Sequence, residues 1–329
     1  MGRVVKLNGY IDLKPVAPLP VLATHSGKFH CDEVFAYAVL RLALGLRSPG
    51  ADHVLLRTRK QELIETADIV WDVGGEFDAP RGRFDHHQRG APVREDGTPW
   101  SSAGLVWQVY GERAVAALLR HAGAEGFAGM IAAELDKSVV LRIDEQDNGV
   151  SAEGPVRKDN LGLGRLVEDC NPAWDDPAAN GPMAGDAAFL TAAALAQDVL
   201  ARRVESMRAK HEAVSIVLAA HEKAEDKRIL VLERGMPWKN VIFSHELPVL
   251  FTISPASNGN WMVDTVPPEP GSFEQRLPLP ESWAGLQNEA LAAESGVDGA
   301  VFVHLRRFVG AAKTRDGALA MARLALEAA

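Results

Sequence analysis

The segment Pro20–Leu46, PVLATHSGKFHCDEVFAYAVLRLALGL, decides the fold prediction. Within it, Pro20–Thr24 is a short apolar run typical of a strand, and Glu33–Leu46 is a longer stretch typical of a helix. A glycine-containing turn joins the two. Strand-like runs recur at His53–Arg57 and Ile69–Asp72. This alternation predicts an α/β fold whose N-terminal part is a parallel sheet flanked by helices.

Further along the chain, the sequence predicts helices, a loop-rich stretch and a long connector. Ser101 and Ser102 suit the N-cap of a helix that runs toward His121, and a second helix is expected from Gly126 to about Arg142. Residues 148–185 contain loop-favouring pairs, Asn171-Pro172 and Gly181-Pro182. Residues 186–227 lack Pro and Gly, which predicts one long helix or two joined helices.

The last hundred residues show the pattern of a smaller α/β domain. Strand-like runs occur at Ile229–Leu232, Val249–Ile253, Trp261–Val266 and Ala300–His304, and a final amphipathic helix is expected from about Thr314. We therefore predict three parts. They are an N-terminal α/β domain (1–185), a helical connector (186–227) and a C-terminal α/β domain (228–329).

Composition narrows the class of protein. Apolar residues make up 47% and charged residues 24% of the 329 residues, as in soluble globular proteins, and no apolar run is long enough to cross a membrane. Two cysteines are too few for a disulfide framework, and residues 1–20 lack a signal-peptide pattern, so we expect a cytoplasmic protein. A net charge of −9 argues against broad capture of nucleic acid, although a local basic groove remains compatible with it.

Acidic and imidazole side chains gather in four groups at the ends of the expected elements. The groups are His25, His30 and Asp32; Asp72; Asp85, His86 and His87; and Asp144 and Asp147. Open α/β sheets bind ligands at such ends. Carboxylates and imidazoles together are ligands for divalent ions of intermediate softness. The pattern predicts a metal-dependent hydrolase.

Each group taken alone also has a structural interpretation. Asp32 would stabilise a helix start, Asp72 would begin a turn, and the Asp85 triplet would be a solvated loop. Asp144 and Asp147 would solvate the end of a helix, and the sequence does not decide which of the two is a ligand. One metal site would explain all four groups together. The neighbouring Cys31 is expected to be a small buried thiol rather than a ligand.

A possible anion site lies near the C-terminus. Phe308–Arg315 joins a strand to a helix through small residues, so backbone amides would meet the cations of Lys313 and Arg315 there. The alternative is an ordinary solvated helix start.

Taken in order, these groups resemble the DHH phosphoesterase superfamily, which is named for a triplet such as Asp85-His86-His87. More closely, the chain resembles the melanocyte-proliferating-gene family. The motifs that carry this resemblance are Thr24–Glu33, Asp72–Asp78, Asp85–Arg89, Ser101–Gly104, Asp147–Gly149, Gly271–Glu274 and Lys313–Arg315 with Gly317-Ala318. The resemblance covers the chain from about Pro20 onward and implies a DHH-type domain with two divalent ions and a C-terminal domain that closes over substrate.

The resemblance also implies a ligand set. One ion would be held by His25, His30 and Asp72, and the other by Asp32, Asp72, His86 and Asp147, with Asp72 bridging. His87 would contact substrate phosphate. Many superfamily members have an acid four residues after the first histidine, whereas this chain has a histidine five residues after it. An extra imidazole favours Mn²⁺, with Mg²⁺ as the alternative.

The expected reaction is two-metal hydrolysis of a phosphodiester or phosphoanhydride, with water attacking phosphorus in line. Candidate catalytic residues are Asp72, His87 and Lys313, and candidate substrate-binding residues are His87, Arg89, Lys313, Thr314 and Arg315. Relatives point to a 3′–5′ exonuclease on short RNA or other oligonucleotides. The alternatives are a small-molecule phosphohydrolase acting on pyrophosphate or a nucleotide, and a non-catalytic metal-binding regulatory protein. The alanine-rich connector also allows a homodimer.

Overall fold

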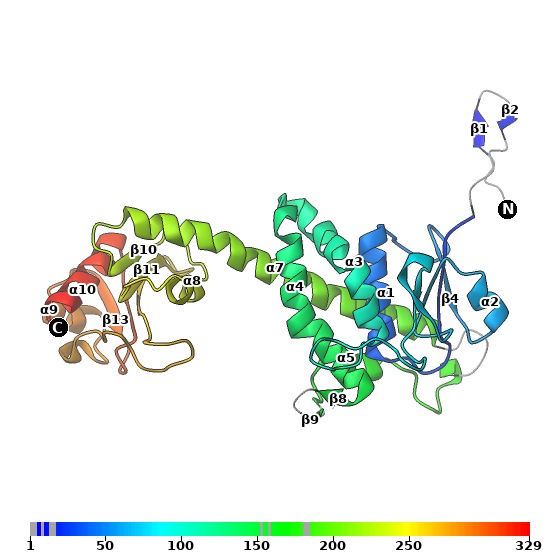
Figure 1. Ribbon diagram of the computed structural model, residues 1–329. Coiled ribbons are helices and arrows are strands. Elements are labelled where there is room, and N and C mark those ends of the chain that lie inside the picture. Colours follow the sequence, from blue (N-terminus) through cyan, green and yellow to red (C-terminus); the bar gives the residue numbers. More distant parts are fainter. Residues whose placement is uncertain (1–4, 8–9, 13–17, 152–153, 157–158, 180–184) are drawn as a thin grey trace. The chain divides into compact units, whose positions relative to one another are not determined.

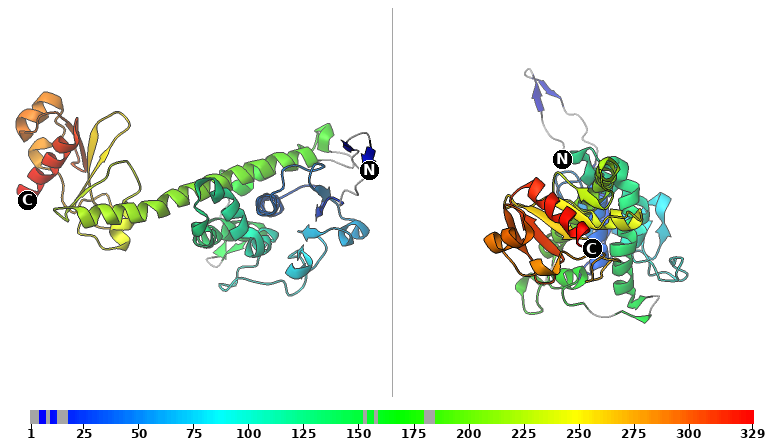
Figure 2. Two further views of the ribbon diagram at one scale, coloured as in Figure 1. Left: turned by 90° about the horizontal axis from the view of Figure 1, so that it is seen from above. Right: turned by 90° about the vertical axis from the view of Figure 1, so that its left-hand side faces the viewer.

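A computed structural model describes residues 5–7, 10–12, 18–151, 154–156, 159–179 and 185–329. It divides into two compact units, Met1–Arg208 and Ala209–Ala329. Helix α7 (Asp186–Lys223) runs unbroken for 38 residues and contributes to both (Figure 2). Of the two expectations for residues 186–227, one long helix and not two joined helices is correct. The three-part division of the chain stays a prediction. The pair Gly181-Pro182 and much of the segment 1–20 lie outside the described residues.

The first unit contains the predicted sheet. Its strand order is β4-β3-β5-β7-β6, and its strands are β3 (Val21–Thr24), β4 (Val54–Arg57), β5 (Ile69–Trp71), β6 (Phe77–Asp78) and β7 (Arg83–Phe84). The first four strands in that order pair in parallel, and β6 pairs with β7 antiparallel. The predicted α/β class is confirmed, and the strands expected at Pro20–Thr24, His53–Arg57 and Ile69–Asp72 are present.

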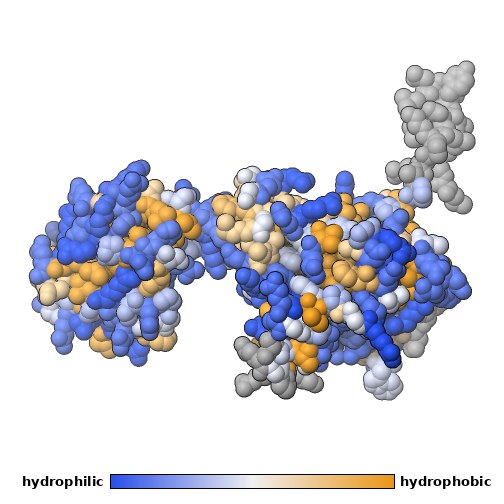
Figure 3. Space-filling view, in the orientation of Figure 1, coloured by the Kyte–Doolittle hydropathy of each residue, from blue (hydrophilic) through white to orange (hydrophobic). Residues whose placement is uncertain are grey.

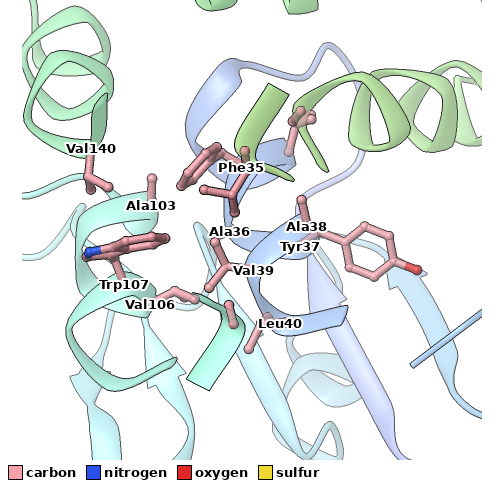
Figure 4. Packing of buried hydrophobic residues seen from close by; sticks show 14 of the residues in the cluster. Phe35, Ala36, Tyr37, Ala38, Val39, Leu40, Ala103, Val106, Trp107 and Val140 are labelled. Atoms are coloured by element: carbon pink, nitrogen blue, oxygen red, sulfur yellow. The ribbon is translucent and has the colours of Figure 1, made fainter. Parts of the chain in front are cut away.

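Helix α1 (Cys31–Leu44) is the centre of this unit (Figure 1). Every residue from Cys31 to Leu40 is buried, because the helix is covered on more than one side. Tyr37 stacks on Trp71 of β5, with ring centroids 6.0 Å apart. On another side, Phe35, Ala36 and Val39 of α1 face Ala103, Val106 and Trp107 of α3 (Ser102–Leu119), as Figure 4 shows. Each large side chain buried here stabilises the fold by about 1.5–3 kcal/mol.

A helical run follows α3 and ends later than predicted. Helix α4 (Ala128–Leu135) continues through a π turn (Asp136–Val140) into α5 (Leu141–Asn148). The expected end near Arg142 was therefore wrong. The run stops at Gly149, whose left-handed backbone (φ 71°) provides a glycine C-cap.

Shorter elements complete the first unit. They are α2 (Gln61–Glu65), α6 (Leu163–Glu168), the hairpins β1 (Val5–Leu7) with β2 (Tyr10–Asp12) and β8 (Val150–Ser151) with β9 (Gly154–Pro155), and 3₁₀ turns at Ala79–Arg81, Arg120–Ala122, Glu125–Phe127 and Pro177–Ala179. The sequence favoured loops over 148–185 and missed α6.

The second unit has a mixed sheet in the order β10-β11-β12-β14-β13. Its strands are β10 (Ile229–Val231), β11 (Phe251–Pro255), β12 (Trp261–Thr265), β13 (Ala300–Val303) and β14 (Val309–Ala312), and only the β10–β11 pair is parallel. Its helices are α8 (Lys239–Ser244), α9 (Asn288–Ser295) and α10 (Arg315–Glu327), with a 3₁₀ turn at Glu281–Trp283. The four expected strands and the last helix are present, whereas β14, α8 and α9 were not predicted.

Within the described ranges, none of the helices combines the length and the apolarity that crossing a membrane would need. On the face shown in Figure 3, hydrophobic residues are interspersed with hydrophilic ones in each unit.

Candidate metal centre

Three neighbouring parallel strands end at one edge of the first sheet and bring the predicted residues together. His25 follows β3, Asp72 follows β5, and the Asp85–His87 triplet follows β7. Because carboxyl ends of parallel strands meet at the same edge, side chains far apart in sequence become neighbours. The N-terminus of α1 and the last turn of α5 supply the remaining groups.

Asp72 occupies the middle of the cluster and uses its two carboxylate oxygens differently. Its Oδ2 lies 3.2 Å from Nε2 of His25, and its Oδ1 lies 3.2 Å from Nε2 of His86. The hydroxyl of Ser102 also donates to Oδ1, at 3.4 Å. The backbone of Asp72 is left-handed (φ 55°), a conformation that non-glycine residues rarely adopt and that is common at functional sites. One carboxylate thus faces two separate groups of donors.

Asp32 is a fully buried carboxylate on the first turn of α1. Among the described residues, no hydrogen-bond donor reaches either of its side-chain oxygens. A buried carboxylate without a partner costs several kcal/mol unless a cation compensates it. Its Oδ2 lies 3.9 Å from Nε2 of His86, so the compensating cation would be shared with the rest of the cluster.

Helix α5 presents Asp147, and not Asp144, to this cluster. Asp147 Oδ2 lies 3.5 Å from Nε2 of His86. Asp144 is turned away and accepts hydrogen bonds from the backbone N and the hydroxyl of Ser101 and from Arg94. Burial raises the pKa of Asp144 to about 6 despite these contacts. Ser101 stands at the N-cap position of α3, but its side chain makes no capping bond because it donates to Asp144.

The donor atoms group into four overlapping sets that could each hold an ion. They are Asp72, Asp85, His86 and His87; His25, His30 and Glu33; His30, Asp32 and Asp147; and Asp32, Glu33 and Asp72, with the ligand atoms of each set within 4.8 Å of one another. Imidazole nitrogens with carboxylate oxygens suit Mn²⁺ and similar divalent ions. Together with the unpartnered Asp32, this donor chemistry fits a centre for divalent ions.

A cavity of about 570 Å³ opens above the cluster. It is lined by His25, His30, Arg59, Asp72, Val73, Gly74, Gly75, Asp85, His86, His87, Asp147 and Asn148. The predicted ligands therefore border a space large enough for a small phosphate compound or the end of a chain.

A family model labelled MYG1_exonuc, and described as the uncharacterised protein family UPF0160, matches residues 21–326. A relative from Homo sapiens named MYG1 exonuclease is 37% identical over 336 residues, which cover 95% of this chain and 87% of the relative. Relatives of the same name from Bos taurus and Rattus norvegicus are each 36% identical, covering 96% of this chain and 90% and 88% of their own lengths. The chain belongs to the MYG1 family. No solved structure gives a significant match to it.

The resemblance to the melanocyte-proliferating-gene family is thus confirmed, and the MYG1 match spans both units. All six ligands implied by that resemblance belong to the overlapping donor sets. His30 lies within reach of two sets, one with His25 and one with Asp32 and Asp147, so its assignment to a single ion is not dictated by the geometry.

In this MYG1-family chain, Asp85 supports His87. Its Oδ1 accepts from Nδ1 of His87 at 2.7 Å and from the backbone N of His86 at 2.8 Å. A ligating histidine usually has a carboxylate that accepts from its other ring nitrogen. Asp85 has this role for His87, whose side chain is 62% exposed and lines the cavity. Arg89 follows in the same loop, is exposed, and does not line the cavity.

Glu33 is a member of the cluster that the sequence reasoning missed. It is fully buried, and its Oε1 lies 2.9 Å from Nε2 of His25. Its two oxygens also accept from the backbone N of His30, at 2.9 Å each, as in a capping box. The sequence signal for this role is the position of Glu33, three residues after His30 at a helix start.

Cys31 is buried on α1, and it belongs to none of the candidate ion-binding sets found among the described residues. Burial raises the pKa of its thiol, which opposes ionisation to a thiolate ligand. This is the buried thiol that the sequence favoured.

Lys313, Thr314 and Arg315 belong to the second unit, at the junction of β14 and α10. Thr314 is the N-cap of α10, and its hydroxyl accepts from the backbone N of Gly317 at 3.1 Å. Lys313 and Arg315 are exposed on either side of it, and Arg315 lies 3.7 Å from Glu233. The last helix begins where expected, but Val309–Ala312 of the expected connection form strand β14, and substrate contact by these residues stays a prediction.

Proposed function

We propose that this protein is a divalent-metal-dependent phosphoesterase that cleaves phosphodiester bonds, acting as a 3′–5′ exonuclease on short RNA or other oligonucleotides in the cytoplasm. The observation that carries the proposal is Asp72, whose two oxygens face His25 on one side and His86 on the other. The relatives named exonucleases support a hydrolase that acts on nucleic acids.

The proposed ligands are His25, His30 and Asp72 for one ion and Asp32, Asp72, His86 and Asp147 for the other, with Mn²⁺ favoured over Mg²⁺ by the number of imidazoles. When bound, such ions supply Lewis-acid stabilisation of phosphoryl oxygens and make water more acidic near neutral pH. Glu33 is buried against His25 and adds a further carboxylate to this donor set.

The remaining residues position groups and move protons. Asp85 holds Nδ1 of His87, which leaves Nε2 for the substrate. A protonated His87 would donate to a phosphoryl oxygen, and a neutral one would accept a proton from water. Ser102 fixes Asp72 through its hydroxyl, which also donates to the backbone O of Phe84 at 3.0 Å.

The proposal is tested with a panel of short RNA, short DNA, dinucleotides and pyrophosphate in the presence of Mn²⁺, with product lengths resolved. We expect stepwise release of mononucleotides from RNA. Asp72→Asn should lower the rate by about 10³-fold, since the ions that would stabilise transition-state charge lose their shared ligand. Arg120→Gln is the control, because Arg120 is exposed beyond the far end of α3, about 27 Å of helix from Ser102. Full activity in Asp72→Asn would reject the site.

A small-molecule phosphohydrolase is the second candidate. Among its described residues, the lining of the cavity contains no Phe, Tyr or Trp on which a base could stack. Activity confined to pyrophosphate would support this alternative and reject the exonuclease. Metal binding without hydrolysis of any compound in the panel would instead support the regulatory alternative.

A further inference from the structure

Arg59 reaches the candidate metal centre from a fourth strand of the same sheet. It stands two residues beyond β4, which pairs in parallel with β3. The pairing continues past the strand end, since the backbone N of Thr58 donates to the backbone O of Thr24 at 2.8 Å. The fold therefore places Arg59 beside His25, although 33 residues separate them.

Two contacts position the guanidinium. Its Nε donates to the backbone O of Ser26 at 3.2 Å, and its Nη2 lies 3.0 Å from Nδ1 of His25, to which it donates when Nδ1 carries no proton. An arginine has five N–H donors in a rigid fork. In the described part of the chain, no contact engages Nη1 of Arg59, so the edge formed by Nη1 and the second N–H of Nη2 remains for another partner.

No carboxylate of the described residues neutralises the charge of Arg59. Arg59 is the one lysine or arginine among the described residues that line the cavity, which also holds the carboxylates of Asp72, Asp85 and Asp147. Even so, no ion pair joins Arg59 to a carboxylate in the described structure. An exposed guanidinium with a free bidentate edge, at the rim of a cavity that borders a metal centre, is arranged for an external anion.

We propose that Arg59 binds the phosphoryl group of the substrate. This inference rests on the proposed function. It adds that two oxygens of the substrate phosphate bind the edge formed by Nη1 and Nη2 of Arg59. Arginine is suited to this role, since its planar fork matches two phosphate oxygens, whereas lysine provides only a point charge.

The contact with His25 links this role to the metal centre. If His25 coordinates an ion through Nε2, its proton resides on Nδ1, which lies 3.2 Å from the backbone O of Ser26 and can donate to it. Nη2 of Arg59 then loses its acceptor on the ring. Arg59 would thus have a further N–H available for phosphate when His25 is a ligand.

The test uses inorganic phosphate as the probe, so that it does not depend on turnover. Phosphate binding to the Mn²⁺-loaded full-length protein is measured by calorimetry for wild type, Arg59→Gln, Arg59→Lys and the control Arg120→Gln. We expect Arg59→Gln to weaken phosphate binding by about 10- to 100-fold, since hydrogen bonds between charged groups are lost. Arg59→Lys should lie between it and wild type, and Arg120→Gln should match wild type.

Mn²⁺ affinity in the absence of phosphate separates substrate binding from support of His25. We expect it to change by less than about 3-fold in Arg59→Gln. A parallel loss of Mn²⁺ and phosphate affinity would overturn the proposal, because Arg59 would then act only through His25. Unchanged phosphate affinity would overturn it as well.

Failure of the Arg59 proposal can be distinguished from failure of the proposed function. If wild type hydrolyses nothing in the substrate panel, the phosphoesterase proposal fails, whereas phosphate titration of the Arg59 variants still gives an answer. If wild type is active, kcat/KM for RNA should fall with the phosphate affinity across the Arg59 series. An unchanged kcat/KM would contradict the proposal for Arg59 but not the phosphoesterase proposal.

Discussion

Asp144 and Asp147 lie one turn apart on α5 but make unrelated contacts. Asp144 is fully buried and bound by Ser101 and by Arg94, whose Nη2 lies 2.7 Å from it. Asp147 faces His86 and lines the cavity. Arg94 also pairs with Asp136 and lies over the ring of Trp100, 3.8 Å from its centroid. Asp144 therefore anchors the loop that follows the Asp85 triplet, whereas Asp147 is available to an ion.

Substituting these two acids should separate stability from metal binding. Asp144→Asn should lower the free energy of unfolding by about 3 kcal/mol, because it breaks one buried ion pair of Arg94 while Asp136 remains. Asp147→Asn should leave the stability of the metal-free protein within about 1 kcal/mol of wild type. It should weaken Mn²⁺ binding by at least about 100-fold. Urea unfolding in EDTA and Mn²⁺ titration measure the two effects, and the reverse pattern would contradict the assignment.

Asp72 combines a left-handed backbone with a central carboxylate, and two variants separate these properties. Asn tolerates the left-handed region, so Asp72→Asn should lose activity and only the stability of the buried contacts with His25 and His86, about 3 kcal/mol. Asp72→Val should in addition be destabilised by about 1–3 kcal/mol, since a β-branched residue is strained there. Thermal unfolding in EDTA with parallel hydrolysis assays checks both. Equal stability of the two variants would show that the backbone conformation is not maintained by the fold.

The sequence was sufficient for the parts of the site that follow from regular periodicity. Short apolar runs located β3, β4 and β5, and residues at their ends were expected to converge. The convergence itself depends on strand order, which places β3, β5 and β7 side by side. Strand order is a long-range property that local patterns do not contain. The family resemblance implied which side chains converge, but not the strand order.

The misses have identifiable physical causes. The acids after Arg142 suggested a helix end, but the buried ion pair of Asp144 with Arg94 allows the helix to continue, and this pairing joins residues 50 apart. Arg59 was not recognised because nothing near it in sequence indicates a site. Its role follows from the position of β4 beside β3. In both cases tertiary contacts, and not local propensity, decide the outcome.

Glu33 should tune the metal centre through its charge. In Glu33→Gln the side-chain carbonyl can still accept from His30, so the start of α1 should be stable to within about 1 kcal/mol. Loss of the negative charge beside His25 should weaken Mn²⁺ binding by about 10- to 100-fold. Glu33→Ala should lose the capping bond as well, at a further cost of about 1 kcal/mol. Mn²⁺ titration and unfolding distinguish the variants.

The matched control for Glu33 is Glu62→Gln, an exposed acid in the first turn of α2. It should leave Mn²⁺ binding unchanged. If Glu33→Gln binds Mn²⁺ as wild type does, Glu33 is a capping residue only, and the centre consists of the predicted ligands.

Binding of Mn²⁺ should release protons and become stronger as the pH rises. Burial disfavours the charged form of His25. Its hydrogen bonds to Asp72 and Glu33 nevertheless raise the pKa of His25 to about 10. Burial and the nearby charge of Asp72 raise the pKa of Asp32 well above its usual range. His25 therefore holds its added proton near pH 7 in the metal-free protein, and ligation requires the unprotonated forms of both groups.

Calorimetry at pH 7 in buffers of different ionisation enthalpy counts the protons released by Mn²⁺ binding. We expect at least about one per protein molecule, and an apparent affinity that increases between about pH 6 and 8. Burial also raises the pKa of Asp147, in the direction that adds to this proton count. His121→Gln, at an exposed histidine of the 3₁₀ turn after α3, should not alter it. An affinity independent of pH would mean that these protonated groups are not the ligands, and the centre would have to be assigned to other side chains.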